Sequence, residues 1–191
     1  MKQLALLAVA AVFAFAAALF WQARQPSQDG EAFDLAAFFA GRSVIEGSIL
    51  TLAMFEEPFT ARFEGTVEGD SLRLEERFAF ADGERLQVWE LAVSPSGAVS
   101  GTVETEMSDG ALAPAVPVSG ASSTSGVVLD YEGHAPGGGA RTFRFRHHLR
   151  GQAGGTVRNH VVVSKFGLPL ATSRVVFAKD PATLSTARGD R

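Results

Sequence analysis

The chain contains no cysteine among its 191 residues. A disulfide framework, a thiolate metal site, a cysteine nucleophile and a lipid-modified cysteine are therefore excluded. Acidic residues outnumber basic ones, and the resulting formal net charge of −4 argues against a nucleic-acid-binding surface. Tyrosine occurs once and phenylalanine 15 times, so an interior rich in rings without polar atoms is expected. With 46% apolar residues the chain is neither disordered nor collagen-like, and its length fits one domain with a short appendage.

The common catalytic and metal-binding motifs are absent as well. The sequence has no G-x-S-x-G, no H-E-x-x-H and no H-x-x-x-H, and the glycines 137–139 lack the Lys-Ser/Thr that completes a phosphate-binding loop. Successive side chains of a strand point to opposite faces, so the adjacent His147 and His148 cannot easily share a metal ion. We therefore predict no metal ion, no cofactor and no catalytic residue.

Residues 4–21 form an unbroken apolar run of 18 residues, and Lys2 precedes it. This length is the lower limit for a membrane-spanning helix and is long for the core of a signal peptide. A cleavage motif of small residues is present at 16–18. Residues 1–23 are predicted to be an uncleaved membrane anchor or a cleaved signal peptide, with a buried core helix as a third alternative, and residues 24–32 a polar linker. The positive charge before the run favours a domain at the cytoplasmic membrane that faces the periplasm, or one secreted to the periplasm after cleavage.

Alternation of apolar and polar side chains dominates residues 43–179, for example at 59–67 and 72–80. Nine or ten short strands at a spacing of roughly 10–14 residues predict an antiparallel meander. A sheet of this length closes on itself to remove its edges. We therefore predict an all-β domain over residues 33–179, a calycin- or lipocalin-like β-barrel, with a β-sandwich as the alternative and a polar tail over 180–191.

Two segments of the domain do not follow the alternating pattern. Residues 33–40 carry one short helical stripe that ends at Gly41, so a short helix is expected before the barrel. Residues 108–126 are dense in proline and glycine. Because Pro114 and Pro117 argue against a central strand, an edge strand and a long loop are expected there.

Three segments also follow one another in an order that is typical of one protein family. They are FDLAAFFAGRSVIEGSI (33–49), FEGTVEGDSLRLEERFAFADGERLQVWEL (63–91) and NHVVVSKFG (159–167). Together they resemble the bacterial family known as domain of unknown function 3833, over about residues 33–179. The resemblance implies an exported, membrane-anchored protein, often a lipoprotein, with a calycin-like barrel, a link to the modification of membrane lipids and no established activity.

The chain departs from the pattern of this family at three places. No cysteine is present to carry a lipid, so any anchor is the N-terminal helix itself. The stretch RHHLRGQAGGTV (146–157) replaces an acidic, tryptophan-containing segment, and His160 replaces the arginine that follows the asparagine. Roles that depend on those residues are therefore not carried over to this chain.

Five residues are candidates for contacts with a ligand inside the barrel: Glu76, Trp89, Asn159, His160 and Lys165. Glu76 shares a strand face with apolar residues, so an inward orientation would bury its carboxyl group and raise its pKa. Trp89 lies on an alternating strand, where it lines a cavity or belongs to the core. Asn159 and His160 point to opposite faces, so one of them faces inward, and Lys165 shares the face of Asn159. For all five, a structural role in the core or in a pair is the alternative.

These observations predict an exported barrel, tethered to the membrane by its N-terminal helix, that binds an apolar ligand or lipid without catalysis. An alternative of a different class is a barrel filled by its own side chains that serves as a structural or assembly partner of a membrane or lipid-modifying enzyme. A third hypothesis is an isomerase or hydrolase that acts on a lipid with Glu76 as general base. The sequence identifies no protein partner and argues against nucleic acid.

Overall fold

The computed structural model describes residues 33–124 and 126–184. The predicted anchor and linker, residues 1–32, and the end of the predicted tail, residues 185–191, lie outside the described residues. Within the described part, no helix combines the length and the apolar character needed to cross a membrane.

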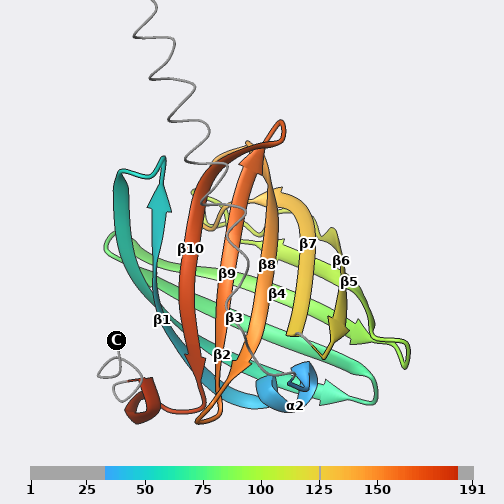
Figure 1. Ribbon diagram of the computed structural model, residues 1–191. Helices are drawn as coiled ribbons and strands as arrows, with labels where there is room; N and C mark the ends of the chain where they lie inside the picture. Colours follow the sequence, from blue (N-terminus) through green and yellow to red (C-terminus); the bar gives the residue numbers. More distant parts are fainter. Residues whose placement is uncertain (1–32, 125, 185–191) are drawn as a thin grey trace, which may run out of the picture.

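Ten strands form one closed antiparallel barrel, in which each strand pairs with the next and the last pairs with the first. The prediction of an antiparallel meander that closes into a barrel is therefore confirmed. A short helix, α2, precedes the strands (Figure 1). The elements are α2 (Leu35–Phe39), β1 (Gly41–Thr51), β2 (Phe55–Glu68), β3 (Ser71–Phe80), β4 (Gly83–Val93), β5 (Ala98–Thr105), β6 (Val116–Ser123), β7 (Gly126–His134), β8 (Thr142–Gln152), β9 (Thr156–Lys165) and β10 (Leu168–Ala178).

The meander places its hairpins alternately at the two ends of the barrel. The hairpins that follow odd-numbered strands lie at one end, which we name the loop end. Its connections are residues 52–54, 81–82, 106–115, 135–141 and 166–167. The hairpins that follow even-numbered strands lie at the opposite end together with α2, and we name this the helix end (Figure 1).

The helix α2 closes the helix end because its apolar side chains enter the barrel. Asp34 caps the helix by accepting a backbone N–H bond of 2.9 Å in the first turn. Leu35 and Phe39 are buried. The ring of Phe39 lies 5.2 Å from that of Phe177 and 5.8 Å from that of Phe63, measured between centroids. The short stripe in the sequence therefore marks a helix whose apolar face packs on the barrel interior.

Two further contacts fix α2 against the strands. Lys179 Nζ donates to the carbonyl oxygens of Phe38, at 2.8 Å, and Ala40, at 2.7 Å. These are carbonyl groups at the C-terminal end of the helix, which attracts positive charge. Gly65 leaves room for the carbonyl oxygen of Phe39, which would lie 1.9 Å from a Cβ atom at position 65. A larger residue there would displace the helix.

Phenylalanine rings fill the interior on the side of β1–β3. Phe59 lies 5.8 Å from Phe78 and 5.5 Å from Phe80, between ring centroids. Closer to the helix end, Phe63 lies 5.3 Å from Phe177. Aromatic pairs at these separations add to the free energy gained from burial. The many phenylalanines of the sequence thus form much of the core.

One prediction about the strands is wrong. Pro117 lies within β6 and pairs with Thr102 of β5, so β6 is a central strand of the closed barrel and not an edge. The proline is the second residue of β6, where the missing N–H affects only the start of the ladder. The long loop is correspondingly shorter, residues 106–115, and it contains Pro114.

Candidate ligand site inside the barrel

Glu76 faces the interior of the barrel from β3. It is 7% exposed and lies in register between Phe63 of β2 and Gln87 of β4. The indole Nε1 of Trp89 donates a hydrogen bond of 3.2 Å to Glu76 Oε2. Burial raises the pKa of Glu76 to about 8, against the opposing effect of that hydrogen bond. The carboxyl group is therefore protonated and uncharged at neutral pH.

Trp89 connects Glu76 to rings on other strands. Its ring centroid lies 5.4 Å from that of Tyr131 and 5.7 Å from that of His147, and both contacts are edge-to-face. Tyr131 belongs to β7 and His147 to β8, neither of which pairs with β4, so these contacts cross the interior. Tyr131 stacks on Phe145 at 4.9 Å, and burial raises the pKa of its hydroxyl group. The phenol is therefore also uncharged.

His147 and Asn159 form a pair on the neighbouring strands β8 and β9. Asn159 Nδ2 and His147 Nδ1 are 3.1 Å apart. Burial, with a smaller contribution from His148, lowers the pKa of His147 to about 4. The imidazole is therefore neutral at pH 7, with one nitrogen that donates and one that accepts.

Two buried atoms of this pair have no hydrogen-bond partner, His147 Nε2 and Asn159 Oδ1. If the Asn159 amide donates to Nδ1, the proton of His147 sits on Nε2, and the pair keeps one unused N–H donor and one unused carbonyl acceptor. If the amide is rotated by 180°, Asn159 Oδ1 accepts from His147 Nδ1–H. His147 Nε2 is then the unused acceptor, and the amide nitrogen of Asn159 is the unused donor. Buried polar groups are nearly always satisfied, and one group that both donates and accepts would satisfy both of these atoms.

These side chains form a continuous layer across the interior. Gln87 Nε2 adds a hydrogen bond of 2.8 Å to Thr105 Oγ1 on the adjacent strand. At neutral pH none of the members is charged. Within residues 33–124 and 126–184, no three His, Asp or Glu side chains gather as a possible metal site. We use the name polar layer for Glu76, Gln87, Trp89, Thr105, Tyr131, His147 and Asn159.

Three of the five residues selected from the sequence belong to the polar layer: Glu76, Trp89 and Asn159. The structure adds His147 and Tyr131, which are not among the ligand contacts expected from the sequence. Both carried a signal, because His147 shares a strand face with phenylalanines and Tyr131 is the single tyrosine of the chain. A polar atom at an apolar, inward position is what identifies them.

The other two selected residues lie outside the polar layer. His160 faces outward from β9 in register with Arg174, and its pKa is lowered by burial first and by Arg174 second. Lys165 ends β9 at the loop end, where it donates to Thr142 Oγ1 at 3.2 Å and lies 3.6 Å from a carboxylate oxygen of Glu132. The structure therefore does not bring His160 and Lys165 together with Asn159 into one site.

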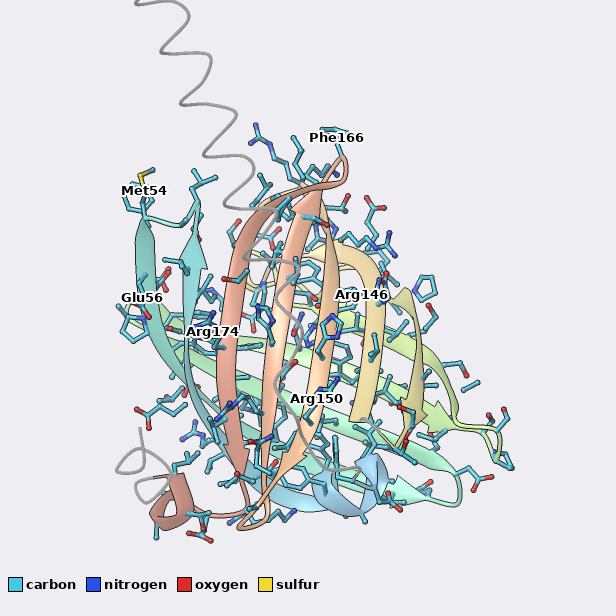
Figure 2. All side chains as sticks on the ribbon, viewed as in Figure 1. Met54, Glu56, Arg146, Arg150, Phe166 and Arg174 are labelled. Carbon is cyan, nitrogen blue, oxygen red and sulfur yellow. The ribbon has the colours of Figure 1, made fainter. Side chains whose placement is uncertain are left out.

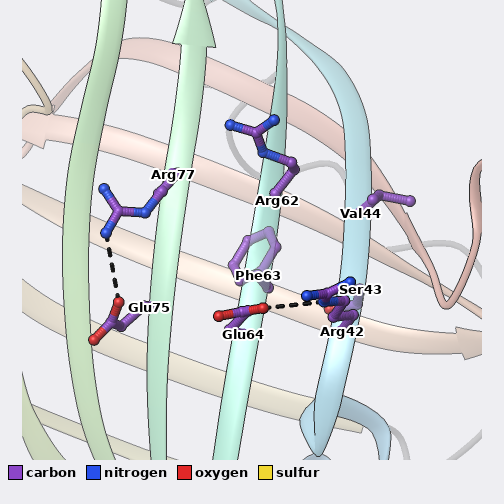
Figure 3. A pocket seen from close by; sticks show the side chains of 8 residues that line it. All are labelled: Arg42, Ser43, Val44, Arg62, Phe63, Glu64, Glu75 and Arg77. Atoms are coloured by element: carbon purple, nitrogen blue, oxygen red, sulfur yellow. Dashed lines mark hydrogen bonds and ion pairs between the residues drawn. The ribbon is translucent and has the colours of Figure 1, made fainter.

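A hollow of about 360 Å³ lies on the wall formed by β1–β3 (Figure 3). Its charged side chains are paired with opposite charges, Arg42 with Glu64 at 3.0 Å and Arg77 with Glu75 at 3.6 Å. Arg62 is likewise paired, with a glutamate of β4. Because these charges neutralise one another, the polar layer is the stronger candidate. The hollow is lined by Arg42, Ser43, Val44, Arg62, Phe63, Glu64, Glu75 and Arg77.

The fold and this interior define a class: a closed ten-stranded antiparallel β-barrel that surrounds a layer of uncharged polar side chains. The chain belongs to the family described as Protein of unknown function (DUF3833), whose model matches residues 12–179. The resemblance noted from the sequence is thereby confirmed over most of the chain. No curated protein matches the chain significantly.

Proposed function

We propose that the barrel binds a lipid or similar ligand that has an apolar body and an uncharged hydrogen-bonding group, without chemical conversion. The observation that carries the proposal is the unpartnered pair of atoms His147 Nε2 and Asn159 Oδ1 in the interior. A buried donor or acceptor without a partner costs about 1–3 kcal/mol. A hydroxyl or amide group supplies both the acceptor and the donor that these atoms lack.

The absence of charge in the polar layer selects the class of ligand. Glu76 is protonated at neutral pH, and His147 is neutral, since their pKa values are about 8 and about 4. A phosphate or carboxylate in such surroundings would lose its hydration without gaining a cationic partner. A long-chain alcohol, an acylglycerol or an amide avoids this cost, and these are the chemical classes that we propose.

The apolar body of the ligand would lie among the apolar side chains of the interior. Since α2 closes the helix end, the ligand would enter at the loop end. Up-and-down antiparallel barrels of the lipocalin type hold small apolar ligands in this way, with the ligand inside and the opening at one end. We propose that this barrel is lipocalin-like in that sense.

We also propose that the barrel is tethered to the cytoplasmic membrane and faces the periplasm. The support comes from the sequence, in which the apolar run at 4–21 follows Lys2. A tether of this kind would keep the barrel next to a supply of lipid.

A barrel that is filled by its own side chains and assists another protein is the alternative. The phenylalanine rings on the side of β1–β3 support it, because they already occupy that part of the interior. The polar layer would then act in the specificity of folding and not in binding. A role for Glu76 as a general base is less favoured, because burial keeps its carboxyl group protonated at neutral pH.

Native mass spectrometry of the full chain, released from a mild detergent, tests the proposal. We expect a bound species that extraction with organic solvent identifies as an uncharged lipid. His147→Leu is expected to weaken the affinity for the lipid about tenfold, the effect of losing roughly 1.4 kcal/mol of binding free energy, and so to lower the bound fraction. The matched control is His148→Leu, which changes the adjacent residue on the opposite face of β8 and should leave the bound fraction unchanged.

Unfolding measurements separate a loss of binding from a loss of folding. Leucine at position 147 removes the hydrogen-bond partner of Asn159 together with the unsatisfied Nε2 atom, so the empty variant is expected to stay folded but to be less stable than the empty parent chain by about 1–3 kcal/mol. A parent chain that carries no lipid, and takes up none from a membrane extract, would refute lipid binding and favour the filled barrel.

A further inference from the structure

We propose that two hairpin tips at the loop end of the barrel insert into the surface of a lipid bilayer. The proposal goes beyond the binding of a ligand in the interior and does not require it. The surface consists of large apolar side chains on the β1–β2 and β9–β10 hairpins. We name it the apolar tips: Leu52, Met54, Phe55, Phe166 and Leu168.

Exposed large apolar side chains are concentrated at the loop end. Phe166 is 92% exposed, Phe55 66% and Met54 64%. Figure 2 shows Met54 and Phe166 on two hairpins that project from the same end of the barrel. Of the large apolar residues exposed in the described part of the chain, Val67 alone lies toward the helix end. Such clustering marks an interaction surface, whereas single exposed apolar residues are common.

The two hairpins are neighbours on the barrel wall. Strand β1 pairs with β10, and the last pair in their register is Thr51 with Ala171. Beyond it, Leu52 N donates a hydrogen bond of 2.8 Å to Leu170 O. The two hairpins that carry the apolar tips are therefore neighbours on the barrel wall, and the sheet holds them at the same end of the barrel.

The backbone at these tips is strained, although the Phe166 side chain gains little from packing against the barrel. Leu52, Ala53 and Phe166 have φ values of 51°, 55° and 51°, in the left-handed region that favours glycine and asparagine. A solvated turn would be better served by those small residues. A bulky ring at position 166 that is both strained and exposed indicates a contact outside the barrel.

A lipid bilayer fits this surface better than a protein partner whose surface carries charges of a single sign. The tips carry both signs, because Glu56 and Glu57 follow Phe55 whereas Lys165 precedes Phe166. Lys165 Nζ lies 5.4 Å from the centroid of the Phe166 ring. Aromatic and lysine side chains are found together at membrane interfaces, where the ring enters the apolar region and the ammonium group stays in water. Zwitterionic headgroups present both charges to such a rim.

The chain that precedes the barrel is long enough for the anchor and the apolar tips to enter the same bilayer. This step rests on the proposed tether. Fully extended, residues 24–32 reach about 30 Å from Phe33, which lies at the helix end. Strands of ten or eleven residues, with typical rise and tilt, give a barrel roughly 25–30 Å high. An anchor formed by residues 1–23 can therefore enter the bilayer that the apolar tips contact.

A single fluorescent label tests the proposal, since the chain has no cysteine of its own. Ala53→Cys places an environment-sensitive dye on the β1–β2 tip and leaves every large apolar side chain in place. The matched control is Ala153→Cys, an exposed alanine in the β8–β9 hairpin at the helix end. The full chains are reconstituted into phosphatidylcholine vesicles that contain a lipid with a nitroxide quencher in its acyl chain.

We expect the emission at position 53 to shift to the blue and to be quenched at least about twofold more than at position 153. In the Ala53→Cys chain, the further change Phe166→Asn should reduce that difference. Equal quenching at the two positions would overturn the proposal. So would a blue shift at position 53 without quenching, which would show that the tips contact protein, such as a second copy of the chain. Flotation with the vesicles reports the tether separately, and bound lipid reports ligand binding separately.

Discussion

Replacing Glu76 by glutamine removes the buried ionisable group of the polar layer and keeps its size. In the unfolded chain the carboxyl group has a pKa near 4.5, whereas in the folded barrel burial raises it to about 8. Below pH 4.5 both states hold the proton. Between pH 4.5 and pH 8 the unfolded chain releases it and the folded chain keeps it. The free energy of unfolding of the parent chain therefore falls as the pH rises through this window.

The magnitude follows from the difference between the two pKa values. At 1.36 kcal/mol for each pH unit, Glu76 lowers the free energy of unfolding by on the order of 5 kcal/mol at pH 8 and above. Glutamine carries no proton to release, and its carbonyl can accept the hydrogen bond of Trp89. Glu76→Gln is therefore expected to match the parent chain near pH 4.5 and to exceed it in stability increasingly up to pH 8. His147 titrates in both proteins, so its contribution cancels in the comparison.

Urea unfolding of both full chains, followed by far-ultraviolet circular dichroism from pH 5 to pH 8.5 in a nonionic detergent, measures this difference. The matched control is Glu75→Gln, which alters the adjacent carboxylate on the outer face, paired there with Arg77. The difference in the free energy of unfolding between Glu75→Gln and the parent chain should not show this increase with pH. If the difference for Glu76→Gln changes by less than about 1 kcal/mol over this range, Glu76 ionises normally in the folded barrel and the reasoning is refuted.

Two further predictions concern the ends of the barrel. Phe39→Ala removes a ring that is 2% exposed and closes the helix end, so urea unfolding should show a loss of about 3–5 kcal/mol, whereas the exposed Ala37→Ser should have little effect. A loss below about 1 kcal/mol would show that α2 contributes little to the core. Leu52→Asn combined with Ala53→Gly supplies the residues that a positive-φ turn prefers, and thermal unfolding should show a gain of about 1–2 kcal/mol. A decrease in stability would mean that the turn is not strained.

Alternation made the fold predictable because one face of each strand is buried and the other is not. Residues 59–67 and 72–80 show this clearly, and they became parts of β2 and β3. Closure followed from the need to protect the edges of so long a sheet. The error at Pro117 has a simple cause, since a proline near the start of a strand costs one N–H group and does not prevent the rest of the strand from pairing.

The candidate site was predictable only in part. The side-chain alternation within a strand set Glu76 on an apolar face, indicated a core or cavity position for Trp89, and set Asn159 and His160 on opposite faces. The contacts of Trp89 with His147 cross the barrel, however, and depend on the register of every strand between them. Register is set by hairpin lengths and irregularities such as the shift between Pro169 and Ala171, which the alternating pattern does not reveal. The hydrogen-bond geometry that leaves His147 Nε2 without a partner appears only once the strands are in place.

The pairing of the first strand with the last has a consequence for the order of folding. Val44 of β1 meets Ala178 of β10, so the closing contact joins segments that are far apart along the chain. During synthesis each hairpin can form as soon as its two strands have emerged, but β1 and β9 remain open edges until β10 is complete. Contacts between such distant segments form slowly, and open edges invite pairing with other chains in the meantime. The last eleven-residue strand therefore decides when the chain stops being prone to aggregation and becomes a barrel.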